Sequence, residues 1–219
     1  VQDDDVFHLI SASRMRPVLH FHRNIGQPGA PEFADPKVIE LDADWRRDSE
    51  YLHVARFADL GTGRGLELFV GTDSWDDYWP NGLEWNDAGY RAYDAAGRWL
   101  GGPLRGFLYA FPVSGDLSDP IIGTGRRVMA GENPVEVYGQ LAPAFGDFRG
   151  TGSLDLVAGE FWNLLQTAPA DDAGDFGAQG VLRPQDGGLL ELDHCIHLPC
   201  VTDWDGDGRP DILVGAEDG

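Results

Sequence analysis

Three segments of this 219-residue chain carry the same pattern and align with one another without gaps. They are FADLGTGRGLELFVG (57–71), FGDFRGTGSLDLVAG (145–159) and VTDWDGDGRPDILVG (201–215). Each contains an Asp, a glycine-rich turn, an acidic residue eight positions after that Asp, an apolar run and a closing Gly. A pattern that returns after several tens of residues predicts an array of similar strand pairs.

A second repeat relates the N-terminal part of the chain to its middle. The sequence VLHFHRNIGQPGAPEF (18–33) matches FLYAFPVSGDLSDPII (107–122), with Gly26 aligned to Gly115 and Pro31 to Pro120. The chain also holds 30 Gly and 14 Pro, which favour turns over long helices. The sequence therefore predicts an all-β protein of short strands joined by tight turns, most simply the blades of a β-propeller.

The repeats resemble FG-GAP/VCBS repeats, the blade unit of integrin-α-like propellers and of many secreted bacterial and fungal β-propellers. The resemblance covers most of the chain, and its most specific motif is DWDGDGRPDILVG (203–215). It implies four-stranded blades in which the Asp-rich turn joins the two innermost strands on the lower face of the ring.

The resemblance also implies where each blade begins and ends. Residues 1–50 would hold the outer strands of one blade, 51–137 and 138–192 two further blades, and 193–219 the inner strands of another. Three blades are too few for a ring, which usually has about four to eight. We therefore expect part of a larger, seven-bladed ring, whose remaining blades come from the same longer polypeptide or from another chain.

The third repeat contains a candidate metal loop. Its acidic residues at positions 1, 3, 5 and 9 are Asp203, Asp205, Asp207 and Asp211. Carboxylate oxygens at this spacing suit Ca²⁺, and the alternative is an Asp-rich turn that binds no metal. The turns after Asp59 and Asp147 carry fewer acids, and in the latter Arg149 stands at the third position and supplies its own cation. We expect calcium at the third turn only.

An aromatic segment separates the strands that end near residue 71 and begin near residue 107. The sequence TDSWDDYWPNGLEWNDAGYRAYDAAGRW (72–99) brings together seven aromatic rings and six acidic side chains. The resemblance places this insertion (72–105) on the upper face, opposite the calcium turn. Rings beside carboxylates suit sugars, so we expect a sugar-binding platform. Its rings are Tyr78, Trp79, Trp85 and Tyr90, whereas Trp75 and Trp99 could equally pack between blades.

Polar side chains are expected on the same upper face. They are His53, Arg105, Tyr138, His194 and His197. With the aromatic insertion, this set resembles that of secreted propeller polysaccharide lyases, which cleave uronic-acid polymers by β-elimination. By that resemblance Arg105 or a His would neutralise the uronate, and Tyr138 or a His would act as base or acid. The alternatives are a non-catalytic calcium-binding propeller that binds glycan or protein, a propeller glycoside hydrolase, and a purely structural propeller whose insertion packs on another domain. Each His could also have a structural role.

Charge and cysteine content limit the remaining possibilities. The net charge of −21 argues against nucleic acid or an anionic membrane surface as a partner, and no apolar run approaches a membrane span. The lyase resemblance implies a secreted or periplasmic protein. Cys195 and Cys200 would point to opposite faces of a straight strand, so a disulfide needs a bend that Pro199 could supply. Free thiols and a local disulfide both remain open.

Overall fold

The computed structural model describes residues 2–3, 6–12, 18–42, 50–74, 104–116, 119–171, 175–193 and 195–217. Every regular element in these ranges is a β-strand, and no helix occurs among them. All pairs of named strands are antiparallel. The predicted all-β class is therefore confirmed.

The middle of the chain forms a meander in which each strand pairs with a strand close to it in sequence. Its strands, in spatial order, are β6 (Glu50–Asp59), β7 (Leu66–Ser74), β8 (Gly106–Ser114) and β10 (Arg126–Arg127). Two short strands, β9 (Ile121–Ile122) and β13 (Glu136–Val137), also pair with β8. We call this the middle sheet.

The next sheet repeats the same meander. Its strands are β14 (Ala142–Gly146), β15 (Asp155–Gly159), β16 (Gln166–Ala168) and β17 (Gly180–Val181). We call it the third sheet, and the last sheet holds only β18 (Leu198–Thr202) and β19 (Asp211–Gly215). The strand pairs β6–β7, β14–β15 and β18–β19 coincide with the three aligned sequence repeats.

The first sheet contains three strands, one more than the two outer strands expected from the sequence. They are β3 (Leu9–Ala12), β4 (Val18–His22) and β5 (Lys37–Glu40). Two small hairpins complete the described strands: β1 (Gln2–Asp3) with β2 (Val6–Phe7), and β11 (Met129–Ala130) with β12 (Asn133–Pro134).

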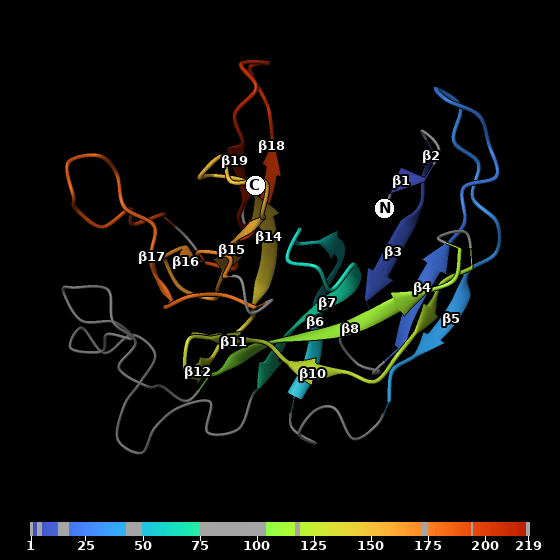
Figure 1. Cartoon of the computed structure of the whole chain (residues 1–219), viewed down its shortest axis with the longest axis horizontal. Helices are drawn as coiled ribbons and strands as arrows, with labels where there is room; N and C mark the ends of the chain where they lie inside the picture. Colours follow the sequence, from blue (N-terminus) through green and yellow to red (C-terminus); the bar gives the residue numbers. More distant parts are fainter. Residues whose placement is uncertain are drawn as a thin grey trace.

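Successive sheets pack against one another in a repeated way. Strand β3 contacts β6, β7 contacts β14, and β15 contacts β18, so each sheet meets the first strand of the next. Figure 1 shows the sheets following one another along the chain, with β5, β10 and β17 on the outside. The described residues form a row of sheets that is not closed into a ring.

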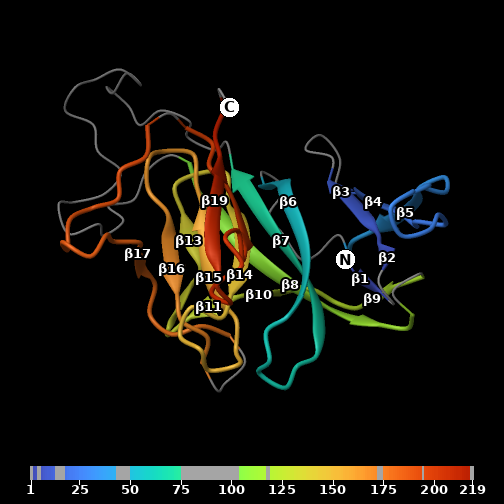
Figure 2. The same cartoon turned by 90° about the horizontal axis from the view of Figure 1, so that it is seen from above.

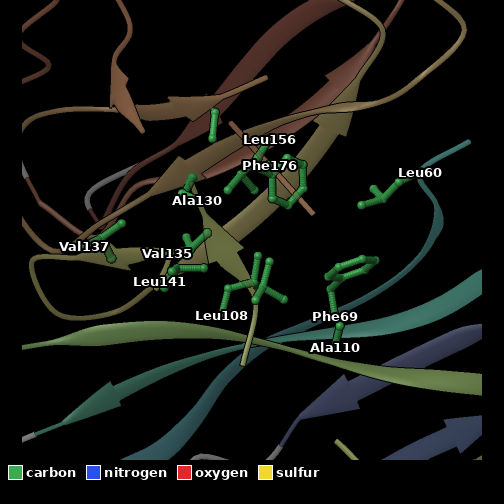
Figure 3. Close-up of a cluster of buried hydrophobic side chains, with 13 residues drawn as sticks. Leu60, Phe69, Leu108, Ala110, Ala130, Val135, Val137, Leu141, Leu156 and Phe176 are labelled. Atoms are coloured by element: carbon green, nitrogen blue, oxygen red, sulfur yellow. The ribbon is translucent and has the colours of Figure 1, made fainter. Parts of the chain in front are cut away.

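Strand β7 shows why the sheets stack, since it is buried on both faces. Leu68 packs in the apolar cluster shared with the first sheet, whereas its neighbour Phe69 packs in the cluster shared with the third sheet. Alternate residues of a strand point to opposite faces, so one strand can contribute to two cores. Figure 3 shows Phe69 and Leu108 converging with Leu141 in the cluster between the middle and third sheets.

The closing Gly of the first two repeats marks where the next sheet crosses. A Cβ added at Gly71 would lie 1.9 Å from the carbonyl oxygen of Leu141, and one at Gly159 would lie 1.9 Å from that of His197. Beside these crossings, the Leu141 N–H donates to the Thr72 carbonyl and the His197 N–H to the Glu160 carbonyl. Gly71 and Gly159 are thus required because the backbone of the following sheet occupies the space of a side chain.

Candidate functional site

The turn between β18 and β19 gathers three of the four expected metal ligands. Carboxylate oxygens of Asp203, Asp205 and Asp211 all lie within 4.8 Å of one another. Gly206 and Gly208 have φ values of 77° and 85°, the left-handed conformation that lets so short a turn fold back on itself. The fourth acid, Asp207, is not in this group, and its Oδ1 accepts a hydrogen bond from the Arg209 N–H at 2.8 Å.

Main-chain hydrogen bonds hold these carboxylates in position. Asp203 Oδ2 accepts from the Gly208 N–H at 3.0 Å, and Asp205 Oδ1 accepts from the Asp207 N–H at 3.1 Å. Asp211 Oδ2 accepts from the Trp204 N–H at 2.8 Å, so the two ends of the turn are tied together. Two oxygens that bind one Ca²⁺ at about 2.4 Å are at most about 5 Å apart, so the three carboxylates fit such an ion.

The equivalent turn of the third sheet uses its acids differently. Asp147 accepts hydrogen bonds from the Gly152 and Thr151 N–H groups, both at 2.8 Å, and these bonds hold the pKa of its carboxyl below the usual value. The side chain of Arg149 pairs with Asp155, the counterpart of Asp211, at 2.8 Å. The guanidinium therefore lies against the carboxylate that a metal would need at this turn.

The turn of the middle sheet also ends in an Arg–acid pair. Glu67, the counterpart of Asp211, is buried and binds Arg126 through both carboxylate oxygens at 3.1 and 3.2 Å. Arg126 also pairs with Asp175 of the neighbouring sheet. The sequence pattern did not predict this network. The available signal was that the turn carries only two acids, Asp59 and Glu67, whereas Arg126 lies outside the repeat.

The three turns lie close together at one end of the sheets. The Leu154 N–H donates to the Leu60 carbonyl at 2.9 Å, which joins the first two turns, and Figure 2 shows them on the same side. An open groove of about 700 Å³ separates the second and third turns. Its lining includes Asp147, Arg149, Asp203 and Arg209.

At the opposite end, two of the expected catalytic side chains are buried. Tyr138 lies between Leu104 and Leu164, and its ring contacts those of Phe161 and Trp162, with centroids 6.0 and 6.2 Å away. Such a position is typical of a core tyrosine.

His197 is also buried, and its placement follows from the sheet crossing described above. Its backbone lies over Gly159, and its ring Nε2 is 3.3 Å from the Asp193 carbonyl oxygen.

The remaining members of the expected set differ in exposure. His53 is half-buried, whereas Arg105 is more exposed and its Nε lies 3.2 Å from Glu136 Oε1. His194 and the four platform residues Tyr78, Trp79, Trp85 and Tyr90 lie outside the described residues. Within the described part, the expected catalytic residues therefore do not form one accessible surface, because Tyr138 and His197 face the interior.

The two cysteines are not joined by a disulfide. Cys195 Sγ donates a hydrogen bond to Glu217 Oε2 at 2.8 Å, whereas Cys200 lies exposed on β18. Among the described residues, no helix is long and apolar enough to cross a membrane.

Comparisons of this chain with protein-family models, with curated proteins and with solved structures give no match. The FG-GAP/VCBS resemblance therefore rests on the repeat residues themselves.

Proposed function

We propose that this chain is a section of a calcium-stabilised β-propeller that binds glycan without cleaving it. The observation that carries the proposal is the Asp203–Asp205–Asp211 group, whose carboxylate oxygens lie within 4.8 Å of one another at one turn. Three carboxylates this close repel one another unless a cation lies among them. Calcium suits the site because all its side-chain ligands are hard oxygens, with main-chain carbonyls and water available for the remaining positions.

The repeated meander supports the propeller part of the proposal. The third sheet has four antiparallel strands in sequence order, and the middle sheet has a path of four, β6-β7-β8-β10, with the short strands β9 and β13 also paired to β8. Each sheet packs on the first strand of the next. Blades of a propeller are built and stacked in this way. The calcium ion would fix the turn of the last sheet, where Arg149 and Arg126 fix the equivalent turns of the others.

The burial of Tyr138 and His197 favours binding over lyase chemistry. A group that transfers a proton to or from a polymer must come within hydrogen-bond reach of it, about 2.6–3.2 Å. Tyr138 is surrounded by Leu104, Leu164 and aromatic rings, so a polysaccharide could reach it only after local rearrangement. The glycan part of the proposal rests on the aromatic sequence of residues 72–99.

Two measurements test this function. Calcium titration followed by calorimetry should show one site per chain, and a chelator should lower the melting temperature. Incubation with neutral and uronic-acid oligosaccharides should quench tryptophan fluorescence without producing the ultraviolet absorbance of an unsaturated sugar. Appearance of that absorbance would show that the protein is a lyase. Absence of both calcium binding and sugar binding would contradict the proposal.

A further inference from the structure

The groove between the second and third turns reflects how this pair of turns differs from the first pair. The first and second turns are joined by the Leu154 N–H, which donates to the Leu60 carbonyl at 2.9 Å. The residues aligned with these two in the third and second turns are Pro210 and Phe148. Proline has no N–H, so the equivalent hydrogen bond cannot form. Pro210 thus removes the contact that draws the first two turns together.

The side chain of Arg149 also keeps the second and third turns apart. Its counterpart in the first turn is Gly61, where an added Cβ would lie 2.6 Å from the Gly152 carbonyl oxygen of the second turn. Arg149 carries such a Cβ, and it would meet Gly208 if the second and third turns lay equally close. The separation is therefore encoded in the residues of the two turns themselves.

The groove has the size and the side chains of a small-molecule site. Its volume of about 700 Å³ lies within the range of about 300–1,000 Å³ that is usual for ligand pockets. Phe148 on its wall is 37% exposed and offers a flat apolar ring. Asp147 and Arg149 line the groove from the second turn, and Asp203 and Arg209 line it from the third.

Two of these polar groups are suited to bind a ligand. The Asp147 carboxylate is held in place by the Thr151 and Gly152 N–H groups, both at 2.8 Å. A carboxylate can accept more hydrogen bonds than these two. Within the described part of the chain, the guanidinium of Arg209 makes no ion pair or hydrogen bond, and only its main-chain N–H is engaged, by Asp207.

The charges of the groove favour a neutral ligand with several hydroxyl groups. Two carboxylates and two guanidinium groups line the groove, so neither an anion nor a cation would meet only opposite charges. The nearby acids Asp205, Asp207 and Asp211 would also repel an anion. A sugar hydroxyl can donate to a carboxylate and accept from a guanidinium, and the C–H face of a sugar can cover an aromatic ring.

We propose that this groove binds a neutral sugar, whose ring stacks on Phe148 and whose hydroxyls bond to Asp147 and Arg209. The site is separate from the aromatic segment 72–99. Strand β7 runs from the turn end of the middle sheet to Ser74, so that segment leaves the sheet at the opposite end. The groove site therefore goes beyond the glycan binding proposed above, and it depends neither on that segment nor on calcium.

Amide NMR spectra of the isotope-labelled chain test the site during titration with glucose, galactose, mannose, xylose, maltose, lactose and cellobiose. We expect the signals of Gly150 and Gly208 to shift and to saturate with at least one of these sugars. Phe148→Ala and Arg209→Ala should each weaken that binding by about tenfold. Phe33→Ala is the matched control, because it removes a 45% exposed ring from the loop between β4 and β5, and it should leave the binding unchanged.

The outcomes separate this site from the aromatic segment. Signal shifts confined to residues 72–99 would overturn the groove proposal and leave the proposed glycan binding intact, whereas shifts confined to the groove would do the reverse. No shift at the groove with any sugar would overturn the proposal. So would an equal loss of binding in Phe33→Ala and Phe148→Ala, or tighter binding of the anion glucuronate than of every neutral sugar. Circular dichroism should show the same strand signal in all variants.

Discussion

Gly159 lies beneath the carbonyl oxygen of His197, so close that an added Cβ would be 1.9 Å from that oxygen. Gly215 is the same residue of the last repeat, and the nearest atom to its added Cβ is the Leu198 carbonyl oxygen at 4.0 Å. The two positions therefore carry identical sequence signals in different surroundings.

This contrast predicts effects of very different size on stability for the same substitution. Gly159→Ala should lower the free energy of unfolding by at least about 2 kcal/mol, because β18 must move off β15 to make room. Gly215→Ala should change it by less than about 0.5 kcal/mol, as is usual for an exposed site. Urea denaturation of both variants checks the pair, and equal effects would contradict the assigned packing.

Calcium binding should depend on Asp205 more than on Asp207. Calcium at 100 times its dissociation constant should stabilise the protein by about 2.7 kcal/mol. Asp205→Asn should abolish most of this gain, since Asp205 belongs to the group of three carboxylates. Asp207→Asn should retain most of it, since Asp207 caps the Arg209 N–H instead. Melting curves with calcium and with a chelator measure both effects, and an equal loss in the two variants would contradict the ligand set.

Arg126 should be needed to keep Glu67 buried. Replacing Arg126 by Met leaves the Glu67 carboxylate without the Nη2 group that donates to both its oxygens, at a cost of about 3 kcal/mol. Adding Glu67→Gln should recover part of that loss, because the buried group is then neutral. Thermal denaturation of the single and double variants tests this, and a double variant less stable than Arg126→Met would oppose the explanation.

The turn at Asp147 should become less stable in acid. Hydrogen bonds from Gly152 and Thr151 lower the pKa of Asp147 in the folded state, so the ionised form stabilises the fold above the unfolded-state pKa. That contribution is lost as the pH falls through the lowered pKa. The melting temperature of Asp147→Asn should therefore fall below that of the wild type at pH 7 and approach it near pH 2. If the difference in melting temperature between the two proteins stays constant with pH, the effect comes from the shape of the Asp147 side chain and not from its charge.

The sugar platform gives a prediction from the sequence alone. Trp79→Ala should weaken binding of the oligosaccharide that the wild type binds by about 1–3 kcal/mol, the scale of one buried apolar side chain. Tyr138→Phe should leave that binding unchanged, because Tyr138 is buried under Leu104 and Leu164. Fluorescence titration measures binding to both variants. Loss of binding in Tyr138→Phe would show that Tyr138 contributes to the sugar site.

The repeats made much of the fold predictable, because each aligned segment specifies a strand, a turn and a second strand. Strand β3 was not predicted, since its four residues carry no Asp turn or closing Gly to mark it. The burial of Tyr138 also lay beyond the sequence pattern. It depends on segments around Phe161 and Leu189 that fold over the ring from outside any repeat.

Placement of the proposed metal ligands was predictable only in part. Spacing in the sequence brought Asp203, Asp205 and Asp211 together correctly, but it could not show that Asp207 turns toward a main-chain N–H. The pairing of Arg149 with the acid of its own turn could be predicted, because Arg149 lies within the repeat. The pairing of Arg126 with Glu67 could not be predicted, because Arg126 reaches Glu67 from a different strand, 59 residues away in sequence.

The row of sheets also bears on how the molecule comes apart. Strand β7 has a neighbouring sheet on each face, whereas the β18–β19 pair contacts the third sheet through β18. Since the main packing contacts of each sheet are with its immediate neighbours, local opening costs least where one interface is lost and most where two are lost. Within the described sheets, backbone amides of β7 should therefore exchange with solvent more slowly than those of strands with fewer packed neighbours, which hydrogen exchange would measure.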